Sequence, residues 1–192
     1  DANGCEWTTG NLVVAQPVPM TVDLGPAVQI NLGELVILNA ETTVPFSALE
    51  SVVWSPVWDT LHADTLIQSF LPVQSGQVSI HLVDTNGCSA NATVLILVDR
   101  IRRVYIPNAI RPESVENDRL VIFGGKDVEM VESFRIYDRW GEQVFEAKEF
   151  LPNDLSVGWD GTYRGTPVNP GVYAYYAVLR FVDGKSEIFQ GD

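Results

Sequence analysis

The stretch that decides the fold is FRIYDRWGEQVF, residues 134–145. Two runs of apolar and aromatic residues flank the tetrapeptide Asp138-Arg139-Trp140-Gly141. Glycine adopts positive φ angles without steric cost, so Gly141 favours a tight turn between two antiparallel strands. We therefore predict a β-hairpin here, entered through Tyr137, and we expect Trp140 to be buried because large aromatic side chains fix the packing of small sandwiches.

Two more elements rich in aromatic residues and glycine follow within 40 residues. One is Gly158-Trp159-Asp160-Gly161-Thr162, and the other is residues 169–176, NPGVYAYY. We predict that Trp159 is buried, that Gly161 occupies a turn, and that Asp160 hydrogen-bonds its own turn. Residues 172–181 carry apolar side chains on both faces, which predicts a central strand. With the hairpin, these elements suggest a meander of antiparallel strands.

The first half of the chain contains a short internal repeat. The pentapeptide DANGC at residues 1–5 recurs as DTNGC at residues 84–88, an offset of 84 − 1 = 83 residues. This spacing is close to the length of one sandwich domain, and Asn-Gly is a strong hairpin-turn signal. We interpret residues 1–17 as the tail of a preceding repeat, and the whole chain as a C-terminal fragment of a longer protein.

Residues 18–98 are predicted to form one β domain, because short alternating runs are separated by glycine, proline and asparagine. Trp54-Ser55-Pro56 and the turn at residues 84–88 resemble PKD-like and immunoglobulin-like repeats of bacterial surface proteins. The expected fold class is therefore all-β, with two tandem immunoglobulin-like β-sandwich domains. Residues 99–103 are interpreted as a solvated linker, although the nearby arginines could instead form a basic contact point for a neighbouring domain.

Composition excludes several functions. The net charge of −13 argues against nucleic acid, which requires lysine and arginine for its phosphates. The sequence has no run of about 18 apolar residues, so we expect no direct membrane insertion. His62 and His81 do not form a metal-ligand pattern, and no catalytic motif is present. We therefore predict a non-enzymatic protein without a cofactor, monomeric as this fragment, with no disulfide between Cys5 and Cys88.

The C-terminal part resembles a known family through five elements in order. They are the Ile-Pro-Asn-Ala step at 106–109, the pair Asn117-Asp118, the corner at 136–141, the Gly-Trp-Asp-Gly-Thr element at 158–162, and the Pro-Gly-Val-Tyr run at 170–173. Residues 104–192 thus resemble the type B C-terminal sorting domain of the type IX secretion system, the gliding-motility-associated C-terminal domain of Bacteroidetes.

This resemblance implies a function and a set of residues. A sorting domain directs a large protein through the periplasm and across the outer membrane to the cell surface or the medium. Its expected partners are the type IX translocon and a PorP/SprF-like outer-membrane protein, reached through a folded surface or an exposed sheet edge. The motif residues carried over are Pro107, Asn108, Asn117, Asp118, Tyr137, Arg139, Trp140, Gly141, Gly158, Trp159, Asp160, Gly161, Gly171 and Tyr173.

Two departures from the family pattern create alternatives. The family's glycine-containing loop before the Asn-Asp pair is replaced by residues 111–116, RPESVE. We predict no metal here, with Glu113, Glu116 and Asp118 as the residues that could still offer oxygen ligands. The chain also stops at Asp192 without a terminal basic residue, so the last strand, expected over residues 185–190, could be truncated or disordered.

An adhesive or carbohydrate-binding surface module is the alternative function. Exposed aromatic side chains would then form the binding platform, and the candidates are Trp58, Trp159 and Tyr163. Such binding would appear as ligand-dependent tryptophan fluorescence, and a glycan array without hits would contradict it.

Overall fold

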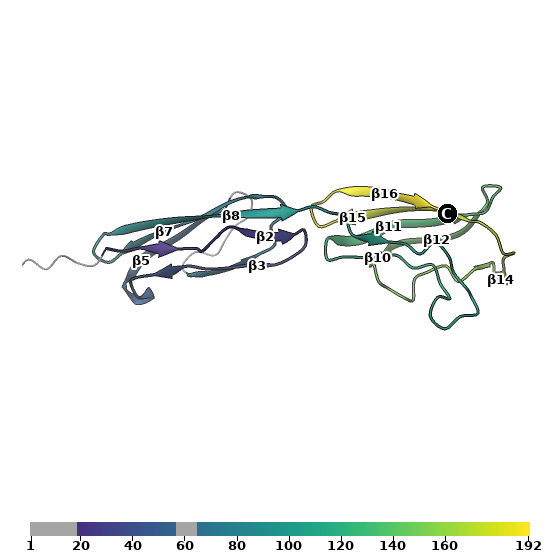
Figure 1. The fold of residues 1–192 in the computed structure, drawn as a ribbon, viewed down its shortest axis with the longest axis horizontal. Coiled ribbons are helices and arrows are strands. Elements are labelled where there is room, and N and C mark those ends of the chain that lie inside the picture. The colour runs from purple at the N-terminus through teal and green to yellow at the C-terminus, as the bar shows by residue number, and fades with distance from the viewer. Residues whose placement is uncertain (1–18, 57–64) are drawn as a thin grey trace, which may run out of the picture.

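The computed structural model describes residues 19–56 and 65–192. Within them the regular structure is β-strand apart from one 3-10 turn at Phe46–Ala48. Two separate hydrophobic clusters form, one from residues before position 99 and one from residues after position 103. The two β-sandwich domains lie end to end along the long axis of the molecule (Figure 1). The all-β prediction with tandem sandwiches is confirmed.

The first sheet of the N-terminal domain has the strand order β2-β8-β7-β5. Its strands are β2 (Val28–Asn31), β5 (Leu49–Pro56), β7 (Gly76–Asp84) and β8 (Ser89–Asp99). β2 runs parallel to β8, while β7 pairs antiparallel with both β8 and β5. The β7–β8 hairpin turns at Asn86-Gly87, where the N–H of Gly87 donates to the carbonyl of Asp84 over 3.0 Å, as the Asn-Gly step predicts.

Shorter strands form the second layer of this domain. β1 (Val22–Asp23) pairs with β4 (Glu41–Thr42), and β3 (Val36–Asn39) pairs with β6 (Ile67–Phe70). The chain therefore passes from one layer to the other between β1 and β2, an arrangement that suits an immunoglobulin-like sandwich. Trp54 is buried between the layers and its indole N–H donates to the carbonyl of Thr65 over 2.7 Å.

Some sequence predictions lie outside the described residues. These are the tail of a preceding repeat at 1–17, and with it Cys5, His62 and Trp58. Cys88 is an exposed free thiol. His81 is exposed, and its Nδ1 lies 2.6 Å from the amide oxygen of Asn91.

The main sheet of the C-terminal domain has the order β12-β11-β15-β16. Its strands are β11 (Val128–Tyr137), β12 (Gln143–Phe150), β15 (Ala174–Phe181) and β16 (Ser186–Gly191). The predicted hairpin is β11–β12, and β15 is central as predicted, because it pairs with β11 on one side and β16 on the other. β16 pairs with β15 from Ser186 to Gly191, so the expectation of a disordered last strand is wrong.

The predicted meander is also wrong. β15 pairs with β11 and not with β12, so residues 151–173 cross to the other side of β11. This crossover contains β13 (Thr162–Tyr163) and β14 (Thr166–Pro167), which pair with each other. The central position buries the inward face of β15, where Ala177, Leu179 and Phe181 have no exposed surface. Burying this face beside β11 is the physical reason for the crossover.

A less regular layer covers the main sheet. β9 (Val104–Tyr105) pairs with β10 (Phe123–Gly124), and Leu120 forms an isolated bridge with Trp159. The start of the crossover is held by Asn153, whose φ is 66°. Its side-chain amide donates a hydrogen bond to the carbonyl of Gly124 over 3.0 Å. The core of this sandwich consists of Leu120, Ile122, Val128, Val131, Phe134, Ile136, Phe150, Trp159, Ala177, Leu179 and Phe181.

The segment between the domains is exposed at Arg100 and Ile101, but Arg102 also makes the basic contact with a neighbouring domain that the alternative describes. The side chain of Arg102 is only 12% exposed and forms ion pairs with Asp183 at 2.9 Å and Glu187 at 3.0 Å. Arg103 reaches the other way, donating from Nη2 to the side-chain oxygen of Asn31 over 2.8 Å. Arg102 and Arg103 therefore each donate to oxygen acceptors in a folded domain.

Candidate functional site

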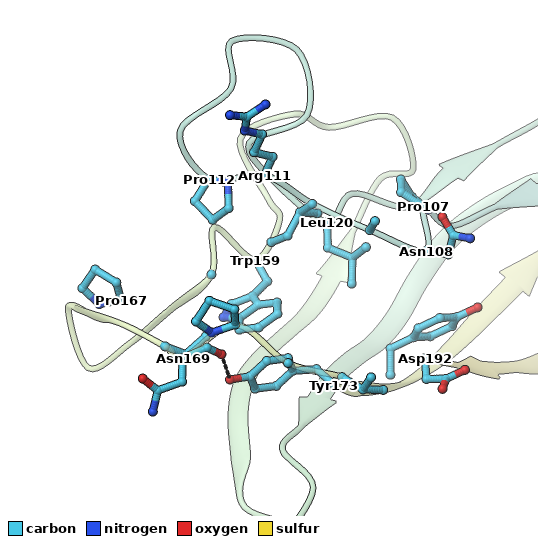
Figure 2. A pocket seen from close by; sticks show the side chains of 18 of the residues that line it. Pro107, Asn108, Arg111, Pro112, Leu120, Trp159, Pro167, Asn169, Tyr173 and Asp192 are labelled. Atoms are coloured by element: carbon cyan, nitrogen blue, oxygen red, sulfur yellow. Dashed lines mark hydrogen bonds between the residues drawn. The ribbon is translucent and has the colours of Figure 1, made fainter.

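The motif residues of the C-terminal domain gather at the end remote from the N-terminal domain. β11 begins beside Asp127, whose carboxylate accepts the backbone N–H of Arg103 over 3.4 Å, and it ends at the turn of residues 138–141. A cavity of about 720 Å³ opens at this remote end. Motif residues from three separate elements border this distal cavity, namely Pro107, Asn108, Trp159, Gly161, Gly171 and Tyr173 (Figure 2).

The Gly-Trp-Asp-Gly-Thr element forms the floor of the distal cavity. Trp159 is 4% exposed, follows the buried Gly158, and donates its indole N–H to the carbonyl of Thr162 over 2.8 Å. The Asp160 carboxylate accepts the backbone N–H of Thr162 at 3.0 Å and its hydroxyl at 2.7 Å. The hydroxyl hydrogen bond lowers the pKa of Asp160 and outweighs the opposing effect of burial. Both predictions for Trp159 and Asp160 are confirmed.

Gly161 joins this floor to the loop that carries Pro107 and Asn108. Its φ is 77°, and a Cβ atom at this position would stand 2.7 Å from Cγ of Pro112. A side chain would therefore be strained by the backbone and would collide with the loop. The predicted turn position of Gly161 is confirmed, and the close packing against Pro112 explains how two distant motifs meet.

Residues 169–173 form the facing wall. The hydroxyl of Tyr173 donates to the carbonyl of Asn169 over 2.8 Å, and its ring lies 4.9 Å from that of Trp159 (Figure 2). Arg139 reaches this wall from the β11–β12 turn, because its Nη2 lies 3.4 Å from the place a Cβ on Gly171 would occupy. The hairpin corner and the Pro-Gly-Val-Tyr run are therefore neighbours at the rim.

The β11–β12 corner is a tight turn, as predicted, but Trp140 is not buried. Gly141 has φ 84° and donates its N–H to the carbonyl of Asp138 over 3.0 Å. Trp140 is 80% exposed, so the prediction of burial is wrong. The reason is its place in the turn between β11 and β12, where residues 139–143 are all exposed. Its ring is partnered by the guanidinium of Arg139 at 4.9 Å.

Asn117 and Asp118 have different local roles. The side-chain amide of Asn117 donates to the carbonyl of Ala109 over 3.0 Å, and its own carbonyl accepts the N–H of Arg111 over 2.7 Å. These bonds close the loop of residues 109–117. Asp118 instead pairs with Arg119 at 3.6 Å.

The metal alternative at Glu113, Glu116 and Asp118 is not supported by their arrangement. Across residues 19–56 and 65–192, no group of three or more His, Cys, Asp or Glu side chains is placed to hold a metal ion. The same described residues contain no helix long and apolar enough to cross a membrane.

Two features were missed by reasoning from the sequence. Tyr175 and Asp192 also border the distal cavity, beside the end of the last strand. The ion pairs of Arg102 with Asp183 and Glu187 fasten the domain at its opposite end. No local pattern signals these contacts, because their partners lie 81 and 85 residues apart in the sequence.

A β-sandwich domain that gathers its distinctive residues at one free end has the form of a recognition module. Residues 104–191 match the family model of the CHU_C type IX secretion signal domain. This C-terminal domain therefore belongs to that family, as its motifs indicate. The match supports a C-terminal sorting role for this domain. A sorting domain on an immunoglobulin-like fold fits a non-catalytic protein.

Comparison with curated proteins gives no match. Among solved structures, the eight N-terminal Ig domains of the Down syndrome cell adhesion molecule share 12% identity at a TM-score of 0.42, over 90% of this chain and 26% of that one. Latent PorU from Porphyromonas gingivalis shares 13% identity at a TM-score of 0.33, over 87% and 18% of the two chains. The chain thus spans about a quarter or less of these proteins, and such distant likenesses carry no functional argument.

Proposed function

We propose that residues 104–192 are a type B sorting signal, read in the periplasm by the type IX translocon together with a PorP/SprF-like outer-membrane protein. Residues 18–98 act as an immunoglobulin-like spacer, joined by the short segment 99–103 and preceded by further repeats. The attached protein then crosses the outer membrane. The domain boundaries at residues 18–98, 99–103 and 104–192 are part of this proposal.

The observation that carries the proposal is the convergence of six motif residues on the distal cavity. This end faces away from the spacer, so a large protein attached upstream would not obstruct it (Figure 1). The rim also carries Trp140, whose side chain is 80% exposed. Exposed tryptophan is enriched among the residues that dominate protein–protein binding.

Rigid attachment at the opposite end supports the same function. Arg102 binds the C-terminal domain while Arg103 binds Asn31 in the spacer. The two domains therefore present the distal end in a fixed direction, which reduces the entropy lost when a partner binds. The carbohydrate-binding alternative gains no such support. Trp159 is buried, and Tyr163 donates its hydroxyl to Glu142 over 3.0 Å.

An export assay tests the proposal. The full 192-residue chain is fused behind a periplasm-directed fluorescent protein in a bacterium with an intact type IX system and the matching PorP/SprF-like partner. We expect fluorescence at the cell surface or in the medium, and its loss in a translocon mutant. Periplasmic retention with both components present would contradict the proposal.

Substitutions then locate the signal. Trp140→Ala removes an exposed aromatic side chain at the distal end, and Phe46→Ala removes one that is 51% exposed on the spacer. We expect the first change to reduce export and the second to leave it intact. Equal export of both variants would remove Trp140 from the recognition surface.

A further inference from the structure

The last strand of the C-terminal domain is an open sheet edge. β16 is hydrogen-bonded to β15 on one side, and within residues 19–56 and 65–192 no strand pairs with its other side. The N–H of Phe181 donates to the carbonyl of Lys185. This hydrogen bond fixes which residues of β16 direct their backbone groups toward β15. Alternate residues therefore direct their backbone N–H and C=O groups away from β15. These residues are Ser186, Ile188 and Gln190.

The opposite edge of the same sheet differs in ways that discourage pairing. The β11–β12 register is interrupted between Ile136 and Tyr137. On β12, Glu149 has φ 53°, and Glu146, Lys148 and Glu149 crowd its second half with charge. Irregular backbone and charged side chains are the means by which natural proteins protect edges from added strands.

β16 has a regular backbone, and its one charged residue, Glu187, is paired with Arg102. Its six residues pair with β15 in an uninterrupted register, from Arg180↔Ser186 to Tyr175↔Gly191. Ile188, in the middle of the strand, is 59% exposed and lies opposite Val178. A regular edge with an exposed aliphatic side chain offers both a backbone ladder and a contact for one apolar side chain of a partner.

The open edge also leads into the distal cavity. Gly191 pairs with Tyr175, and both Tyr175 and the following Asp192 border the cavity. A strand laid along β16 would therefore reach the cavity mouth at one end. The volume of about 720 Å³ and the walls of proline, tryptophan and tyrosine suit one or two large apolar side chains.

We propose that β16 is the docking strand of the signal, and that the type IX machinery's outer-membrane partner adds an extended segment to it. The added segment forms backbone hydrogen bonds with Ser186, Ile188 and Gln190, and an apolar side chain near its end enters the distal cavity. A row of outward N–H and C=O groups is complementary to another extended backbone, which is why a strand is the occupant. This inference rests on the proposed sorting function and names how its partner binds.

Proline substitution tests the backbone ladder directly. Ile188→Pro and Gln190→Pro each remove an outward N–H but no hydrogen bond to β15, and proline is tolerated on an edge strand in that orientation. Ile188→Thr and Gln190→Thr are matched controls, because they change the side chain and keep the N–H. All four are made in the full chain, and the midpoint of thermal unfolding is recorded for each.

The two proline substitutions are then combined in one chain and the two threonine substitutions in another. In the export assay we expect the double proline variant to lose about tenfold or more of its surface fluorescence, while the double threonine variant exports like wild type. Export of the proline variant at the wild-type level would overturn strand addition and leave the sorting function standing. Equal loss in both variants would assign recognition to the side chains and also overturn it. Retention of the wild-type chain would overturn the sorting function and this inference together.

Hydrogen exchange provides a readout that needs no variant. The full chain is mixed with the purified PorP/SprF-like partner in detergent, and backbone exchange is followed along β16. Slower exchange at Ile188 and Gln190 in the mixture supports the added strand. Unchanged exchange at these amides, with protection elsewhere on the domain, overturns it.

Discussion

The guanidinium of Arg102 lies 2.9 Å from the carboxylate of Asp183 and covers the ring of Phe181 at 4.0 Å. Asp183 belongs to the turn that connects β15 to β16, so this ion pair ties the interdomain segment to the hairpin that contains the open edge. The side chains are only 12% and 5% exposed. The stability of the hairpin therefore depends on a residue that precedes the matched family region.

Replacing Arg102 should destabilise the C-terminal domain. Arg102→Ala leaves the buried Asp183 without its partner, and breaking a buried pair costs about 3 kcal/mol. Arg102→Lys keeps the charge but loses the fork that reaches two carboxylates, so we expect a smaller loss. Calorimetry should show the transition of this domain lowered by roughly 10 °C or more for Arg102→Ala. The exposed Arg100→Ala is the control, and equal shifts for both would contradict the prediction.

Stability should fall in acid, with Asp183 as one cause. Burial is the largest influence and raises the pKa of Asp183, but the hydrogen bonds from Arg102 and from the backbone N–H of Lys185, together with the positive charges of these two residues, outweigh it, and the net pKa lies below the ordinary value of 3.8. A carboxyl group with a lowered pKa in the folded state stabilises the protein above its unfolded pKa, and this contribution is lost as the pH falls through the folded value.

The free energy of unfolding should therefore decrease as the pH falls below about 4. Asp183→Asn should be less stable at neutral pH and should show a shallower decrease in acid. Urea unfolding between pH 2.5 and 7 measures both slopes. Parallel curves for the two proteins would show that Asp183 does not contribute.

The two tryptophans of the sorting motifs should respond differently to truncation. Trp159→Ala removes a side chain that is 4% exposed and should cost about 4 kcal/mol. Trp140→Ala removes one that is 80% exposed and should change stability by about 0.5 kcal/mol or less. Denaturant unfolding of both variants checks this order. A large loss for Trp140→Ala would mean that its ring packs against the domain in solution.

Substitution of Gly33 should loosen the junction between the domains. Gly33 has φ 84°, and a Cβ atom there would collide with the backbone carbonyl of Lys126 in the C-terminal domain. Gly25 is a matched control, because its φ is 76° and no atom lies within 4 Å of its Cβ position. Gly33→Ala should therefore open the junction, whereas Gly25→Ala should produce only local backbone strain.

Trypsin provides a simple measurement, because residues 1–99 contain no lysine or arginine and Arg100 is the first cleavage site. We expect cleavage at residues 100–103 to be several-fold faster in Gly33→Ala than in wild type or Gly25→Ala. Similar rates in the two alanine variants would indicate that the contact with Lys126 does not hold the junction.

Local sequence determined much of this protein. Alternating apolar residues determined the all-β class, and Asn86-Gly87 and Asp138 to Gly141 determined two hairpin turns, because turn geometry depends on residues that are adjacent in the chain. The five ordered motifs likewise indicated the sorting family, since each motif is a short run of neighbouring residues. Asp160 could be assigned its turn because its partner, Thr162, is two residues away.

Tertiary structure alone decided what depends on distant partners. The crossover that places β15 beside β11, the exposure of Trp140, and the partners of Arg102 each depend on which layer covers which strand. A residue pattern gives the faces of a strand but not its neighbours, since burial of the same apolar face is compatible with several strand orders. The distal cavity and the open edge of β16 arise from that order, which only the folded chain reveals.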